Sequence, residues 1–85
     1  ALLNGPALAL TPATALSLGM IFHELATNAA KFGALSVNEG RVLVDWTVSG
    51  TEPRTLSLTW RELDGPGVEP LEATISIPLD RGDSA

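Results

Sequence analysis

The stretch from Thr11 to Gly33 constrains the fold most, because its pattern predicts one long amphipathic helix. A threonine hydroxyl can accept an early backbone N–H, and Pro12 at the first helical position has no N–H to lose. The helix is predicted over residues 12–32, with Gly33 closing it in the left-handed conformation. Apolar residues recur on one side at helical spacing, and these are Leu18, Phe22, Leu25, Ala29 and Phe32. That side is expected to pack.

Gly19 interrupts the middle of this helix. A glycine there costs up to about 1 kcal/mol relative to alanine. We expect the close approach of another backbone at Gly19 as compensation.

The opposite side of the helix carries Glu24, Asn28 and Lys31 within roughly 60° of one another. An amide oxygen is a hard ligand for magnesium, an ammonium attracts phosphate oxygens, and a carboxylate can orient or deprotonate a hydroxyl or water. The set would suit a magnesium-bound polyphosphate. The alternative is an ordinary solvated face with a helix-stabilising pair, and on spacing alone that alternative is favoured.

Three later segments alternate apolar and polar residues, which is typical of half-buried strands. The apolar sides are Val42, Val44, Trp46 and Val48; Leu56, Leu58 and Trp60; and Ala73, Ile75, Ile77 and Leu79. A short edge strand is also predicted over residues 7–10, and residues 80–85 are interpreted as a polar tail. One helix and several one-sided strands predict a two-layer α/β sandwich.

Glu62 falls on the apolar side of the second strand. A carboxylate there is costly unless a group hydrogen-bonds to it. Either the strand has ended by Arg61 and Glu62 meets solvent, or a partner donates an N–H, as an adenine amino group does. The following loop contains Gly65 and Gly67, which allow close approach of a ligand but are more often just a turn.

Composition excludes several classes of function. The net charge is −5, with five Lys and Arg in all, which argues against a nucleic-acid surface. There is no cysteine, one histidine, and no apolar run long enough to cross a bilayer. A single module without membrane contact, in the cytoplasm, is the expectation; because the chain opens on Ala1, we expect it to be part of a longer protein.

Two motifs resemble a known family. The segment His23–Ser36, with the sequence HELATNAAKFGALS, looks like the N box of the HWE family of sensor histidine kinases. The segment Trp60-Arg61-Glu62, followed by Gly65-Pro66, is similar to the Trp-x-Glu motif in that family's first glycine box. The resemblance extends from about Gly5 to Val68 and includes the histidine, tryptophan and glutamate that name the family.

The resemblance implies a Bergerat-type ATP-binding fold of the GHKL group, with ATP and Mg2+ as cofactors. The implied activity is that of a protein histidine kinase, which passes the γ-phosphoryl group to a histidine on a separate dimerisation domain and then to a response regulator. It also implies a homodimer formed through that dimerisation domain.

The resemblance assigns roles to the N-box residues. Asn28 would coordinate the magnesium ion, Glu24 would orient metal-bound water or act as a base, and Lys31 would face the phosphates. His23 is a family marker, and a structural and a functional role are equally open for it.

In the first glycine box, the resemblance assigns recognition of the adenine amino group to Glu62. Asp64 is the alternative, because the common Asp-x-Gly-x-Gly spacing does not fit this sequence cleanly. Gly65 and Gly67 would line the same pocket.

The chain departs from the family after Val68. There the family continues with a mobile lid, a second glycine box and a further helix, whereas here Val68-Glu69-Pro70 leads directly into a strand-like segment at Leu71. A segment missing between residues 70 and 71 is the favoured interpretation. The alternative function is a degenerate GHKL-like domain that serves as a docking or phosphotransfer scaffold and binds no nucleotide.

Overall fold

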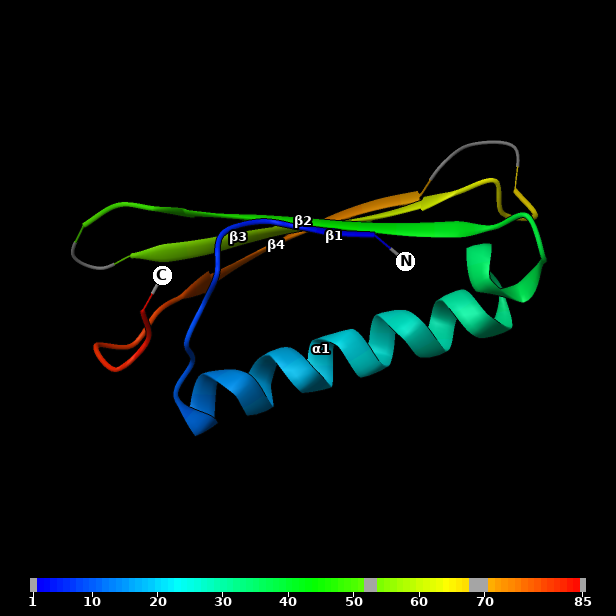
Figure 1. Cartoon of the computed structure of the whole chain (residues 1–85). Coiled ribbons are helices and arrows are strands. Elements are labelled where there is room, and N and C mark those ends of the chain that lie inside the picture. Colours follow the sequence, from blue (N-terminus) through cyan, green and yellow to red (C-terminus); the bar gives the residue numbers. More distant parts are fainter. Residues whose placement is uncertain (1, 52–53, 68–70, 85) are drawn as a thin grey trace.

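One helix lies along one face of a four-stranded sheet (Figure 1). The computed structural model describes residues 2–51, 54–67 and 71–84. Within these ranges the elements are β1 (Leu2–Asn4), α1 (Pro12–Lys31), the 3-10 turn η1 (Ala34–Ser36), β2 (Arg41–Ser49), β3 (Thr55–Leu63) and β4 (Leu71–Pro78). The molecule is elongated, with extents of 41 × 20 × 16 Å.

The strands lie in the order β1-β2-β3-β4. β2 pairs antiparallel with β3, and β3 with β4, so that Trp60 has Val44 on one side and Ala73 on the other. β1 pairs parallel with β2. Because parallel neighbours need a crossover connection, α1 between β1 and β2 supplies that connection and is carried under the sheet.

The start of α1 agrees with the sequence prediction. The Thr11 hydroxyl accepts the Thr14 backbone N–H at 3.3 Å, and Pro12 occupies the first turn. At the other end the last helical residue is Lys31. Across residues 2–51, 54–67 and 71–84, the structure contains no helix with both the length and the apolar character needed to span a bilayer.

Two predictions about helix glycines are wrong. Gly33 has φ −113° and ψ −150°, an extended conformation, and the cap is Phe32, whose N–H donates to the carbonyl groups of Ala29 and Asn28. Gly19 has no close neighbour, because a Cβ built there would meet nothing within 4 Å. The middle of α1 faces open space at this point.

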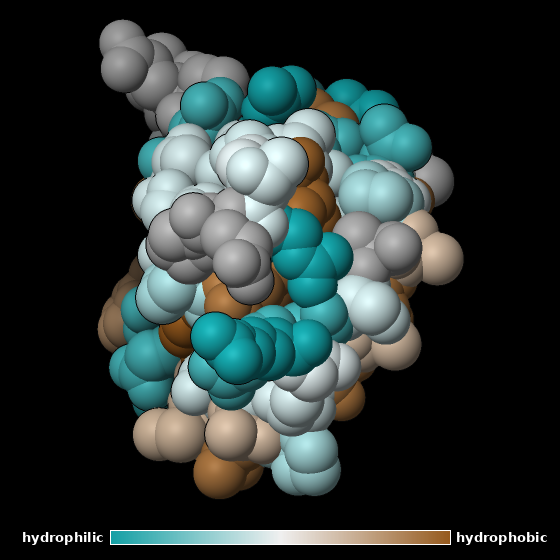
Figure 2. Space-filling model, turned by 90° about the vertical axis from the view of Figure 1, so that its left-hand side faces the viewer, coloured by the Kyte–Doolittle hydropathy of each residue, from teal (hydrophilic) through white to brown (hydrophobic). Residues whose placement is uncertain are grey.

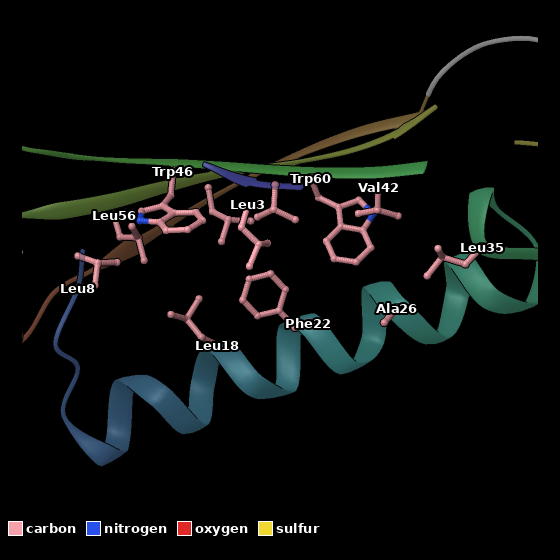
Figure 3. A pocket seen from close by; sticks show the side chains of 12 residues that line it. Leu3, Leu8, Leu18, Phe22, Ala26, Leu35, Val42, Trp46, Leu56 and Trp60 are labelled. Carbon is pink, nitrogen blue, oxygen red and sulfur yellow. The ribbon is translucent and has the colours of Figure 1, made fainter. Parts of the chain in front are cut away.

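The core forms between α1 and the inner face of the sheet, from the sides that helical spacing and alternation predicted. Phe32 is the exception: it was predicted to pack, but it follows the last helical residue and is 77% exposed. Its buried members are Leu18, Ala29, Val42, Val44, Leu56, Leu58, Trp60 and Leu79. An apolar cavity of about 480 Å³ lies between α1 and the sheet, and most of these buried residues line it. Figure 3 shows side chains of the sheet, including Trp46 and Trp60, pointing toward Leu18, Phe22 and Ala26 of α1 across this space.

The predicted edge strand and polar tail are both wrong in detail. The edge strand is β1, and of residues 7–10 only Ala9 pairs, in an isolated bridge to Ser84. In the tail, Asp83 is buried and accepts the Thr11 backbone N–H at 2.6 Å and the Thr14 hydroxyl at 2.8 Å. Residue 85 lies outside the described residues.

Figure 2 shows the end of the molecule where the start of α1 and the tail after β4 lie in Figure 1. Hydrophilic residues (teal) cover much of the centre of this view, and hydrophobic residues (brown) show between them.

Candidate functional site

A small cavity of about 140 Å³ lies where the end of α1 meets the end of β3 and the loop after it. Its lining residues are Phe32, Gly33, Ala34, Glu62, Gly65, Pro66, Gly67 and Leu71. Three residues singled out from the sequence, Glu62, Gly65 and Gly67, therefore come together. They do so because β3 is followed directly by the glycine-containing loop.

Among the described residues of this lining Glu62 is the one that carries a charge, and it is only 7% exposed. It belongs to β3, which continues to Leu63, so the interpretation that the strand ends by Arg61 is wrong. Its Oε1 accepts the Ala34 backbone N–H at 2.9 Å, and its Oε2 accepts the Trp60 indole N–H at 3.0 Å. These two donors offset the cost of burying the carboxylate.

Glycines allow the backbone to close around Ala34. A Cβ on Gly33 would overlap Glu62 Oε1, and a Cβ on Gly40 would overlap the Ala34 carbonyl group. A Cβ on Gly65 would lie 3.1 Å from the Ala34 Cα, tighter than an ordinary contact. The close approach at Gly65 is therefore made, at least in part, by the protein's own backbone.

Asp64 forms an ion pair with Arg41. It has φ 56°, in the left-handed region, and its carboxylate accepts from Arg41 Nη2 at 2.9 Å and Nε at 3.2 Å. Both side chains are exposed. Asp64 is not among the residues that line the cavity, whereas its alternative, Glu62, is.

Glu24, Asn28 and Lys31 lie exposed along α1 and do not line the Glu62 cavity. The Asn28 carbonyl accepts the Phe32 N–H at 2.9 Å, so Asn28 lies one turn before the cavity residues Phe32 and Gly33. Further toward the start of α1, Glu24 and the exposed His23 share a shallow hollow of about 370 Å³. In the described ranges, no group of three or more His, Cys, Asp or Glu side chains is placed to hold a metal ion.

The two hydrogen-bond donors to Glu62 were not predicted from the sequence. Trp60 stands two residues before Glu62, and the period of a strand places both on one face, so this pairing had a local signal. Ala34 is 28 residues away in the chain, and no local pattern indicates that contact. The predicted missing segment between residues 70 and 71 adjoins Pro70, which lies outside the described residues.

Comparison with known proteins gives several similar sequences. The chain is 40% identical over 82 residues to blue-light-activated histidine kinase 1 of Erythrobacter litoralis. The aligned region covers 91% of this chain and 22% of the relative. The chain is 40% and 34% identical over 67 residues to the blue-light-activated histidine kinases of Brucella anthropi and Brucella ovis, covering 78% of this chain and 14% of each relative. No protein-family model matches the chain. The chain is related to histidine kinases and spans less than a quarter of the length of these relatives.

Proposed function

We propose that this chain is the ATP-binding catalytic part of an HWE-type histidine kinase and that Glu62 recognises the adenine base. The observation that carries the proposal is a buried carboxylate facing a small glycine-lined cavity. Because a carboxylate accepts and does not donate, it selects a ligand that offers an N–H. The relationship to histidine kinases supports a nucleotide as that ligand.

The walls of the cavity suit a flat base. Phe32 and Leu71 both line it, and both are exposed, at 77% and 52%. Exposed apolar side chains beside a cavity favour an apolar ligand surface that would cover them. A base that covers these side chains and donates an amino N–H to Glu62 satisfies both features.

The exposed face of α1 supplies groups for a metal-bound phosphate chain. The Asn28 amide oxygen is a suitable magnesium ligand, Lys31 adds positive charge, and Glu24 can orient water or accept a proton. With no acidic or histidine cluster among the described residues, phosphate oxygens and water would have to complete the coordination of Mg2+. Bound MgATP would supply the phosphoryl group; the protein holds it and neutralises its charge.

The remaining parts of the reaction belong to other domains. We propose that a histidine on a separate dimerisation domain of the same protein accepts the phosphoryl group, that the protein is a homodimer through that domain, and that a response regulator receives the group in the cytoplasm. The chain offers no second histidine besides His23.

A second candidate is a degenerate GHKL-like domain that serves as a docking or phosphotransfer scaffold without binding nucleotide. One observation favours it: Glu24, Asn28 and Lys31 do not line the cavity that contains Glu62. In that case both donors to Glu62 are purely structural, and the exposed face of α1 is an ordinary solvated surface.

Titration with a fluorescent ATP analogue, with and without magnesium, separates the two candidates. The kinase proposal predicts micromolar, magnesium-dependent binding that weakens at least about ten-fold in Asn28→Ala, as expected for loss of a bond to a charged group. Asn38→Ala, which removes an exposed amide from a turn, is the matched control and should bind as the unsubstituted chain does. Absence of binding in every variant would support the scaffold.

A further inference from the structure

Trp60 precedes Glu62 by two residues on β3, and both side chains lie on the same face of the sheet. Its indole N–H donates to Glu62 Oε2 at 3.0 Å. The Trp60 ring lines the large apolar cavity under the sheet, where Figure 3 shows it, whereas Glu62 lines the small glycine-containing cavity. This hydrogen bond therefore joins the apolar core to the proposed base site.

Packing holds the donor in place. The Trp60 ring centroid lies 6.2 Å from that of Phe22, with 44° between the ring planes, and Trp60 is 5% exposed. An indole N–H donates a hydrogen bond and cannot accept one, so it can bind a carboxylate oxygen but not another hydrogen-bond donor. A glutamate side chain has several rotamers, and a fixed donor removes most of them.

The second carboxylate oxygen is held independently. The Ala34 N–H donates to Oε1, and Gly33 leaves the space that this oxygen occupies. With one donor on each oxygen, the carboxylate still has lone pairs for a ligand N–H and presents no hydrogen to a ligand carbonyl group. Because its orientation is set in advance, the ligand does not lose affinity to the ordering of the side chain.

We propose that Trp60 is a positioning residue whose indole N–H holds the Glu62 carboxylate toward the cavity. It thereby sets the preference for a purine with an amino group over one with a carbonyl group at the same position. The inference rests on the proposed function. Trp46 provides a matched control, because its indole N–H donates elsewhere, to the Pro6 carbonyl at 2.7 Å.

The test compares the affinities of ATP and GTP, each with magnesium, for the unsubstituted chain, Trp60→Phe and Trp46→Phe. In Trp60→Phe we expect ATP affinity to fall about ten-fold and the ratio of ATP to GTP affinity to fall with it. Trp46→Phe should keep both values. An unchanged ratio in folded Trp60→Phe would overturn this inference alone, whereas absence of nucleotide binding by the unsubstituted chain would contradict the proposed function and the inference with it.

A second measurement does not depend on the folding of Trp60→Phe. The two indole N–H resonances of a 15N-labelled chain are recorded before and after Glu62→Gln. The resonance of Trp60 should move, because its acceptor loses charge, and that of Trp46 should stay. A Trp60 resonance that does not move would overturn the inference.

Discussion

Gly33 and Glu62 lie so close together that a Cβ on Gly33 would overlap the Oε1 atom of Glu62. The same oxygen accepts the N–H of the next residue, Ala34. The Glu62 carboxylate thus connects the backbone that follows α1 to the end of β3. Glycine is required at position 33 for this contact and not for a left-handed conformation, because its φ is −113°.

Gly33→Ala should therefore disturb the site. The new methyl group must displace Glu62 or shift the backbone, and overpacking of this kind costs about 1–3 kcal/mol of unfolding free energy. Urea denaturation measures that loss. An alanine variant with unchanged stability and unchanged nucleotide affinity would show that Glu62 can move without consequence.

Gly19→Ala, the same substitution on the open side of α1, should have the opposite effect. Nothing lies within 4 Å of the added Cβ, and alanine favours the helical state by about 0.5–1 kcal/mol. Urea denaturation should show a higher midpoint with nucleotide affinity unchanged. A lower midpoint would mean that Gly19 has a packing partner after all.

Asp83 should make the chain sensitive to acid. Burial raises the pKa of Asp83, but the hydrogen bonds donated by Thr11, Thr14 and the Asp80 N–H outweigh burial and hold the pKa below its ordinary value. A lowered native pKa contributes stability above the unfolded pKa, about 3.9, and this contribution is lost as the pH falls through the native pKa.

Asp83→Asn should consequently be less stable at neutral pH and lose less of its stability below pH 4 than the unsubstituted chain. Chemical denaturation at a series of pH values measures both effects. The Arg54 guanidinium, which donates to the Asp83 carbonyl, stays in place in the variant because that contact is to the backbone. Parallel pH profiles for the two chains would contradict the assignment.

Lys31→Met tests the proposed phosphate contact separately from the base contact. Lys31 is exposed in the last turn of α1, and loss of a charge-assisted contact should weaken ATP binding about ten-fold. Adenosine, which has no phosphate, should bind equally well to both chains. Arg81→Met, at an exposed position in the tail, is the control. Equal losses for ATP and adenosine would contradict a phosphate role.

Local patterns predicted much of the fold. Helical spacing and the Thr11-Pro12 cap predicted α1 to within one residue at its end, and alternation predicted the inner faces of β2, β3 and β4. The contacts that escaped prediction join residues far apart in the chain. The Asp83 contact to Thr11 spans 72 residues, and the Glu62 contact to Ala34 spans 28, and no periodicity indicates either of them.

The same distinction applies to the candidate site. Alternation predicted that Glu62 faces inward, but not which groups donate to it. The spacing of the polar residues on α1 correctly predicted that they share one side of the helix, and these are Glu24, Asn28 and Lys31. They do not line the cavity, because the residues of this segment that do so follow the end of the helix at Lys31. Their role in binding phosphate stays a prediction.

A titration of the 15N-labelled chain with MgATP, followed by NMR, shows whether a nucleotide base occupies the cavity at Glu62. We expect saturable shifts concentrated on the backbone amides of Ala34, Gly65 and Gly67 and on the side-chain amide of Asn28. Thr47 and Thr59, on the outer side of the sheet, should stay unchanged. Shifts confined to other surfaces, or no shift at millimolar MgATP, would show that no base binds beside Glu62.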